Sequence, residues 1–131
     1  MKRILISLMV LTIAAAALAA GEKAGKARAI SYPELSKLLA ESTSDVLLVD
    51  VRTAEEYAAG RISGAVLFPY DEIGKRKGEF SNLAGKTDRR IVVYCRSGRR
   101  SAVAANTLVQ LGYTNVADFG GIGNWKGKLV R

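Results

Sequence analysis

The chain contains no histidine and only one cysteine, Cys95. Without histidine the thiol cannot be activated by a Cys-His pair, so a reactive cysteine would depend on backbone dipoles and arginine. A single cysteine cannot form an internal disulfide, and the stability of the fold must therefore come from its packed core. These two absences make the lone thiol the most informative residue of the sequence.

The N-terminus has the features of a secretory signal peptide. Lys2 and Arg3 are followed by an almost unbroken apolar run at residues 4–13, and Ala17-Leu18-Ala19 is an A-x-A cleavage signal. The apolar stretch is short for a membrane-spanning helix, and no cysteine lies near the cleavage site to carry a lipid. We therefore expect residues 1–19 to be removed on export to the bacterial periplasm, leaving no stable membrane span.

The remainder is expected to form a single domain. Residues 20–29 are small and charged without apolar periodicity, so we interpret them as a flexible lead-in to a domain at 30–131. The formal net charge is +8, and the chain stays basic without Lys2 and Arg3. Export removes nucleic acid as a partner, so a small anionic substrate or an anionic membrane surface is the better match. No dimerisation stripe is present, which favours a monomer.

Apolar runs alternate with helical patterns along the domain. Strands are predicted at residues 45–51, 65–68, 91–94 and 116–119. Helices are predicted to begin with capping patterns at 31–34 and 53–56, and to occur at 71–75, at 99–111 and around Trp125, whereas 78–88 is interpreted as a loop with one helical turn. In the helix at 99–111, the residues expected to face the sheet are Ala102, Val103, Leu108 and Leu111. This alternation predicts an α/β domain with a parallel sheet between helices.

Cys95 lies where the strand at 91–94 gives way to a turn rich in arginine and glycine. Ligands of parallel sheets bind beyond the carboxyl ends of strands, and Asp50 also lies at such an end. Backbone N–H groups and the dipole of the following helix are expected to hold the thiol exposed and ionised. A lone cysteine is often a small buried hydrophobe, but three nearby arginines argue against burial. The candidate substrate-binding residues of the turn are Arg96, Ser97, Gly98, Arg99, Arg100 and Ser101.

Four sequence motifs, taken in order, resemble those of the rhodanese family of sulfurtransferases. They are Asp50-Val51-Arg52 with Glu56-Tyr57, then Gly60-Arg61-Ile62-x-Gly64-Ala65, then the Cys95 loop, and finally Gly120-Gly121 with Trp125. The resemblance implies a three-layer αβα domain with a central five-stranded parallel sheet, similar to the exported single-domain thiosulfate sulfurtransferases. One departure is Arg61, where the family usually has histidine, and it concerns a local hydrogen bond more than the chemistry.

Carried over by position, Cys95 corresponds to the family's nucleophile. The resemblance implies that it takes a sulfane sulfur from a thiosulfate-like donor, forms a persulfide, and passes the sulfur to cyanide or a thiol. It implies no metal or organic cofactor. Asp50 is interpreted either as a residue that orients the thiol or as a turn cap. Arg52 is interpreted as the partner of Glu56 in an ion pair that holds the loop.

Two other functions remain open. A cysteine phosphatase also uses a thiolate in a ring of N–H groups, but its loop needs five residues between cysteine and arginine. Here Ser101 occupies that position and Arg100 comes one residue earlier, which predicts a smaller bowl for the anion. The second alternative is a module that carries a persulfide or binds a partner without turnover.

Overall fold

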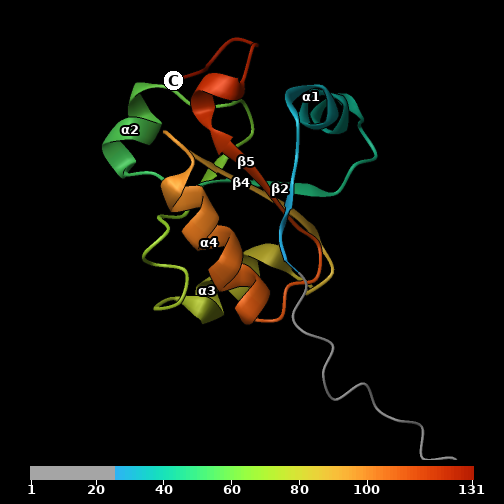
Figure 1. Cartoon of the computed structure of the whole chain (residues 1–131), viewed down its shortest axis with the longest axis vertical. Coiled ribbons are helices and arrows are strands. Elements are labelled where there is room, and N and C mark those ends of the chain that lie inside the picture. Colours follow the sequence, from blue (N-terminus) through green and yellow to red (C-terminus); the bar gives the residue numbers. More distant parts are fainter. Residues whose placement is uncertain (1–25) are drawn as a thin grey trace, which may run out of the picture.

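The computed structural model describes residues 26–131 (Figure 1). The predicted signal peptide and residues 20–25 of the predicted lead-in lie outside the described residues. The described part forms a five-stranded sheet in the order β1-β5-β4-β2-β3, and all four neighbouring pairs are parallel. This confirms the predicted α/β class and its central parallel sheet. In residues 26–131, no helix has the length and apolar character needed to cross a membrane.

The strands agree with the apolar runs of the sequence, with one addition. Their bounds are β1 Arg28–Ala29, β2 Val46–Asp50, β3 Val66–Leu67, β4 Arg90–Cys95 and β5 Val116–Gly121. The additional strand is β1, which pairs with Ala117 and Asp118 of β5. Both of its residues are exposed, so no apolar pattern marks it. The fold therefore starts inside the predicted lead-in rather than at residue 30.

Two of the helices, α1 and α2, begin where capping residues predict them. Their bounds are α1 Tyr32–Ala40, α2 Ala54–Ala59, α3 Lys77–Ala84 and α4 Arg99–Gln110, with a 3-10 turn η1 at Ile122–Asn124. Ser31 accepts a hydrogen bond from the N–H of Glu34 at 3.4 Å and so caps α1. Thr53 and Glu56 form a complete capping box at α2, and Gly60 ends that helix.

The helix predicted at 71–75 is wrong. Residues 70–76 form hydrogen-bonded turns, and α3 follows them. It contains the single helical turn predicted within 78–88 but is longer, since it spans Lys77–Ala84. Phe80 and Ala84 lie one turn apart on α3 and are both buried. The ring of Phe80 makes edge contacts with Phe68 and Tyr113, at centroid distances of 5.1 and 5.4 Å. Tertiary packing therefore stabilises a helix whose local sequence signal is weak.

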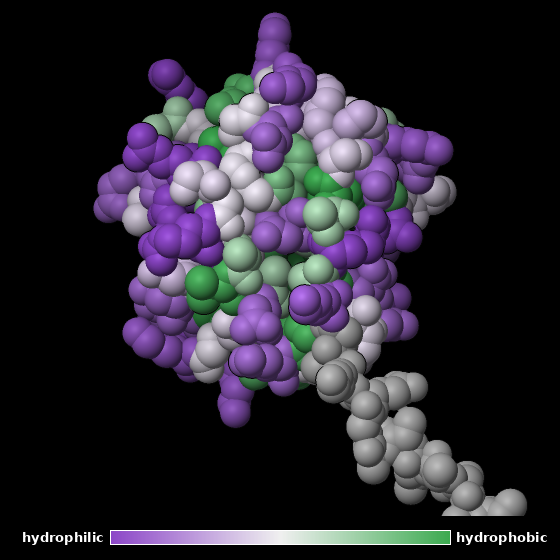
Figure 2. Space-filling view, viewed as in Figure 1, coloured by the Kyte–Doolittle hydropathy of each residue, from purple (hydrophilic) through white to green (hydrophobic). Residues whose placement is uncertain are grey.

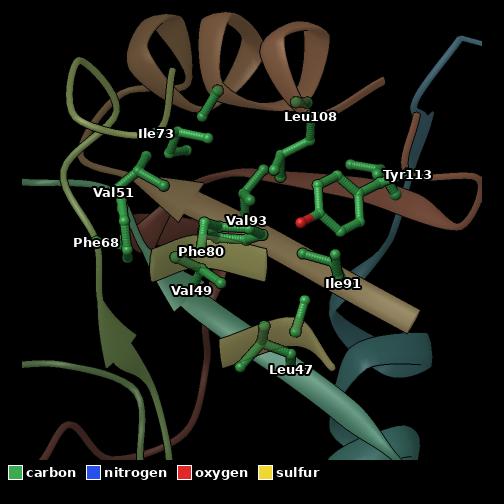
Figure 3. Close-up of a cluster of buried hydrophobic side chains, with 14 of the residues drawn as sticks. Leu47, Val49, Val51, Phe68, Ile73, Phe80, Ile91, Val93, Leu108 and Tyr113 are labelled. Carbon is green, nitrogen blue, oxygen red and sulfur yellow. The ribbon is translucent and has the colours of Figure 1, made fainter. Parts of the chain in front are cut away.

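Helices cover both faces of the sheet and produce three layers. One apolar cluster lies between the sheet and α3 and α4, with Val49, Phe80 and Leu108 among its members (Figure 3). A second cluster on the opposite face includes Leu35 of α1 and Leu48 of β2. Alternate residues of β2 thus enter opposite clusters, as expected for a strand buried on both faces. On the face shown in Figure 2, apolar residues form small areas among hydrophilic ones.

The inward face of α4 differs in part from its prediction. Leu108 is fully buried as expected, but Val103 and Leu111 are 44% and 37% exposed, and Ala102 is also exposed. The residues that face the sheet are Ser101, Ala104, Ala105, Leu108 and Val109. Ser101 is the one polar residue of this face, and it lies beside the thiol. Small residues then let α4 pack closely on the sheet.

Candidate active site

Cys95 is the last residue of β4, and α4 begins only four residues later. The connection depends on Gly98, which has a φ of 101°, in the left-handed region that favours glycine. This turn directs the N–H of Gly98 back to the sulfur, which accepts its hydrogen bond at 3.0 Å. The N-terminus of α4 and the sulfur therefore face each other directly.

The surroundings of Cys95 favour the thiolate. Burial raises the pKa of the thiol, but hydrogen bonds from the Ser101 hydroxyl and from the N–H groups of Ser101, Gly98 and Ser97 lower it by more, so the pKa lies below its ordinary value. The Ser101 hydroxyl also lies 3.1 Å from the carbonyl oxygen of Gly98. Its single proton serves one acceptor at a time, and ionisation of Cys95 makes the sulfur the stronger acceptor.

The expectation of an exposed thiol is wrong, because Cys95 is 0% exposed. It belongs to the apolar cluster beneath α4, and the loop of residues 96–101 folds over its sulfur. The arginines do not enter the interior with it: Arg96 and Arg99 are exposed. Their abundance was therefore misleading evidence against burial, since the chain turns outward immediately after the cysteine.

The backbone of the Gly120-Gly121 motif packs directly against the backbone of the Cys95 loop. A Cβ atom at Gly121 would lie 2.6 Å from the carbonyl oxygen of Arg96, closer than any side chain can approach without a shift of backbone. A Cβ atom on Gly98 would lie 3.7 Å from the Cα of Gly120. The loop thus rests directly on the end of β5, and glycine at position 121 is needed for this close contact.

The structure corrects the predicted pairing of Arg52 with Glu56. Glu56 instead binds Arg100 with two hydrogen bonds, of 2.8 and 3.0 Å, from Nη1 to Oε1 and from Nη2 to Oε2. The hydrogen bond from Arg100 is the largest of the effects that together lower the pKa of Glu56 from 4.5 to about 2. This ion pair connects α2 to the first turn of α4 and so fixes the position of the Cys95 loop. The partners are 44 residues apart, which explains why local spacing missed the pair.

Arg52 instead pairs with Asp50 in a buried ion pair. Its Nη2 donates to Oδ2 of Asp50 at 2.7 Å and to the carbonyl oxygen of Gly60 at 2.6 Å. The N–H of Arg52 binds Oδ1 of Asp50 at 3.0 Å, so Asp50 is the turn cap of the two interpretations. Asp50 also accepts a hydrogen bond from the hydroxyl of Tyr94, at 2.8 Å. Through Tyr94, the residue before Cys95, the pair holds the end of β4.

The remaining loop residues lie on the surface. Arg96, Ser97 and Arg99 are exposed. Within residues 26–131, neither Arg96 nor Arg99 forms an ion pair, in contrast to Arg100. Two exposed guanidinium groups of the loop are therefore free to bind an anion, whereas the charge of Arg100 interacts with both Glu56 and Cys95.

Residues 31–128 match the family model described as the rhodanese-like domain. This chain belongs to the rhodanese family. Among its curated relatives, a sulfurtransferase of Allochromatium vinosum is 44% identical over 97 residues, which are 73% of the chain and 85% of the relative. The thiosulfate sulfurtransferase PspE of Escherichia coli is 35% identical over 74 residues, 56% of the chain and 68% of the relative. The putative sulfur carrier protein YrkF of Bacillus subtilis is 35% identical over 105 residues, 76% of the chain and 54% of the relative.

A solved structure supports the rhodanese-like fold of this chain. The rhodanese-like domain protein of Staphylococcus aureus is similar with a TM-score of 0.65 and 33% identity, over 79% of this chain and 98% of that one. The resemblance drawn from the four motifs is therefore confirmed at the level of family and fold. Relatives named as sulfurtransferases support sulfur transfer as the general activity of an enzyme of this class.

Proposed function

We propose that this protein is a thiosulfate sulfurtransferase that works through a persulfide on Cys95. The observation that carries the proposal is the set of hydrogen-bond donors around the sulfur, from Ser97, Gly98 and Ser101, which lower the pKa of the thiol. The thiolate is the nucleophilic form of cysteine, so these donors favour the form of Cys95 that attacks the donor. The same donors stabilise negative charge on a persulfide.

The reaction balances in two displacement steps. The Cys95 thiolate attacks the outer sulfur of thiosulfate, the S–S bond of the donor breaks, and sulfite leaves with the electron pair. Cyanide or a thiolate then attacks the terminal sulfur of the persulfide. The bond to Sγ breaks, and its electron pair restores the Cys95 thiolate. Neither step needs a metal or an organic cofactor.

The exposed arginines support the choice of an anionic donor. Thiosulfate carries two negative charges, and Arg96 and Arg99 lie at the rim of the loop. They attract the dianion and orient it above the sulfur. Because Cys95 is fully buried, the donor displaces loop atoms from above the sulfur as it binds.

Mass spectrometry of the purified protein after exposure to thiosulfate tests the proposal. We expect one added sulfur atom on the peptide that contains Cys95, its removal by cyanide, and formation of thiocyanate. Protein treated with sulfite in place of thiosulfate is the control and gains no sulfur. Absence of the added sulfur from thiosulfate-treated protein would refute the persulfide mechanism.

A persulfide carrier without turnover is the second candidate, and the similarity to the putative sulfur carrier protein YrkF supports it. Steady-state kinetics separate the two functions. An enzyme forms many thiocyanate molecules per protein, whereas a carrier forms one and stops. A cysteine phosphatase is a weaker candidate, and hydrolysis of an arylphosphate by the purified protein would be the observation in its favour.

We also propose that the mature protein acts after export, as a monomer. The motif at Ala17-Leu18-Ala19 supports cleavage of a signal peptide. Because an exported protein is separated from nucleic acid by the membrane, its basic composition is better explained by a small anionic donor. N-terminal sequencing of the protein from a periplasmic extract tests this. A mature chain that begins near residue 20 is the expected result, and a chain with an intact N-terminus retained in the cytoplasm contradicts it.

A further inference from the structure

Two exposed apolar side chains lie next to each other near the end of the chain. Leu129 and Val130 are 48% and 38% exposed, whereas the other large apolar side chains of comparable exposure in the described residues, Val103 and Leu111, belong to α4 or its end. Every residue from 126 to 131 is exposed, so the whole segment lies on the surface. Exposed apolar residues that are neighbours, rather than scattered singly, mark candidate interaction sites.

The segment is exposed but held in one conformation. Arg61 and Val130 exchange two backbone hydrogen bonds, of 2.9 and 2.8 Å. The indole N–H of Trp125 donates to the carbonyl oxygen of Lys128 at 3.3 Å. Leu129 lies between these two attachments, and Figure 1 shows the C-terminus beside α2. Because the backbone is already fixed, little conformational entropy is lost when a partner binds there.

Cations surround the two apolar side chains. Lys126 and Lys128 are exposed, and neither forms an ion pair within residues 26–131. Arg61, whose backbone binds the segment, has its guanidinium over the ring of Tyr57 at 4.3 Å and has no acidic partner in the same part of the chain. Arg96 lines the same hollow as Leu129 and adds a further positive charge.

Acidic residues do little to offset these charges. The sequence from 119 to 131 contains no aspartate or glutamate. On the neighbouring helix α2, Glu56 is already paired with Arg100 at 2.8 Å. Glu55 lies in the first turn of α2, whereas Leu129 packs at Gly60, the residue that ends that helix. The surface around the segment therefore has a positive potential.

We propose that residues 125–131, which we call the membrane-binding segment, bind the surface of a membrane that contains anionic phospholipids. Leu129 and Val130 enter the headgroup layer, and Lys126 and Lys128 pair with lipid phosphates. Exposed apolar residues flanked by cations, with a tryptophan beside them, are typical of proteins that bind in the plane of a membrane interface. This inference goes beyond the proposed function and does not depend on it.

The apolar pair favours lipid over other anionic partners. An acidic protein or a nucleic acid would satisfy the lysines, but neither accounts for apolar side chains between them. A bilayer has hydrocarbon directly beneath a dense layer of phosphates, which matches this arrangement of side chains. Two apolar side chains and a few charges provide reversible binding that salt weakens, in contrast to the insertion of a spanning helix.

The fluorescence of Trp125 reports binding, because it is the single tryptophan of the chain and lies in the segment. The test uses a chain that begins at residue 20. It keeps the whole sheet and both apolar clusters and lacks the predicted signal peptide, which would itself bind lipid. Vesicles of phosphatidylcholine alone are compared with vesicles of equal parts phosphatidylcholine and phosphatidylglycerol.

Only the vesicles with phosphatidylglycerol are expected to shift the emission of Trp125 to shorter wavelength. We also expect brominated acyl chains to quench this emission, and high salt to reverse both effects. Polyglutamate, a soluble polyanion, is expected to cause no shift. Absence of quenching by the brominated lipid overturns the proposal. A shift with polyglutamate but not with vesicles also overturns it and identifies an acidic protein as the partner.

Paired charge variants locate the binding site. In Lys126→Gln with Lys128→Gln, partitioning onto the anionic vesicles is expected to fall about thirtyfold. Lys75→Gln with Lys77→Gln is the matched control, since it removes the same charge from exposed residues next to and in α3. Figure 1 shows α3 at the opposite end of the molecule from the C-terminus. The control retains partitioning, and equal losses in the two variants would show that net charge, not the segment, causes binding.

The apolar contribution is tested separately. In Leu129→Ser, partitioning is expected to fall about fivefold, because the half-exposed side chain no longer enters the lipid. Leu111→Ser is the matched control, since Leu111 is also a partly exposed leucine but lies at the end of α4. Val130→Ser is a second variant, and its backbone bonds to Arg61 do not involve the side chain. Circular dichroism verifies the fold of each variant. Partitioning equal to wild type in both Leu129→Ser and Val130→Ser contradicts the proposal.

Discussion

The helices α2 and α4 both begin at the carboxyl end of the sheet, after β2 and β4, but the N–H groups of their first turns are bound in opposite ways. At α2, Thr53 and Glu56 satisfy the first N–H groups with their own side chains. At α4, the N-cap residue is Gly98, which has no side chain to offer, and its N–H binds the sulfur of Cys95. The N-terminus of α2, which we call the closed terminus, is capped by side chains of its own sequence. The N-terminus of α4, which we call the open terminus, has N–H groups that bind the sulfur.

This difference separates a structural helix start from a functional one. A complete capping box stabilises a helix but leaves no donor for a ligand. The uncapped start of α4 forgoes that local stability, and the missing interaction is replaced by the thiolate. The two termini are also connected, because Glu56 of the capping box binds Arg100 of α4. The closed terminus thereby positions the open one.

The largest expected effect on activity comes from replacing Cys95, whose thiolate is the anion bound at the open terminus. In Cys95→Ser, the rate of thiocyanate formation from thiosulfate and cyanide is expected to fall about a thousandfold or more, because a serine hydroxyl is not ionised at neutral pH. The fold is retained, as circular dichroism would show, since the substitution changes one buried atom. A rate equal to that of wild type would disprove the assignment of Cys95 as nucleophile.

The second largest effect is expected at Gly121, whose backbone packs against the Cys95 loop at the open terminus. In Gly121→Ala, the new Cβ would lie 2.6 Å from the carbonyl oxygen of Arg96, so the loop must shift. Overpacking of this kind costs about 1–3 kcal/mol, and activity is expected to fall about a hundredfold from misplaced donors. Urea denaturation and thiocyanate assays measure the two effects. Gly123→Ala is the matched control, because nothing lies within 4 Å of a Cβ at that position. Equal losses of stability and activity in both variants would show that the close contact between Gly121 and Arg96 is not the cause.

The third prediction compares the two termini directly. In Ser101→Ala, the thiolate loses a donor, so the pKa of Cys95 rises, and the pH midpoint of its alkylation by iodoacetamide is expected to move up. In Thr53→Ala, the cap of α2 is lost and the free energy of unfolding falls by about 1 kcal/mol. The alkylation midpoint stays in place in that variant. Midpoints that move equally would show that the two termini do not differ in function.

The smallest expected effect concerns the ion pair between the termini. Because the pKa of Glu56 is lowered from 4.5 to about 2, its stabilising contribution is present above pH 4.5 and is lost as the pH falls towards 2. In Glu56→Gln, the free energy of unfolding at pH 7 is expected to fall by about 1 kcal/mol, as for other partly exposed pairs. The difference from wild type disappears near pH 2. Urea denaturation across this range measures it, with the exposed Glu55→Gln as control, and a difference independent of pH would contradict the pairing.

Patterns confined to a few residues predicted much of this molecule. The apolar run before Cys95 and the capping residues Ser31 and Thr53 located a strand and two helix starts correctly. These signals are reliable because the interactions that cause them lie within one turn or one strand. The turn after Cys95 was recognisable for the same reason, since its glycine and the helix behind it are contiguous in sequence.

Features that depend on distant partners were missed. The helix α3 exists because Phe80 packs between Phe68 and Tyr113, residues that no local pattern relates to it. The pairing of Glu56 with Arg100 and the burial of Cys95 depend in the same way on how α4 docks on the sheet. The strand β1 is invisible for another reason, because both of its side chains are exposed.

The two edges of the sheet have a consequence for solubility. Both edge strands, β1 and β3, contain only two residues. An edge strand offers a row of unpaired backbone groups to other chains, and a long flat edge promotes aggregation. Here the longer strands β2, β4 and β5 are enclosed between short ones, so little backbone is available for intermolecular pairing. Concentrated solutions of the protein are therefore expected to resist assembly into fibrils.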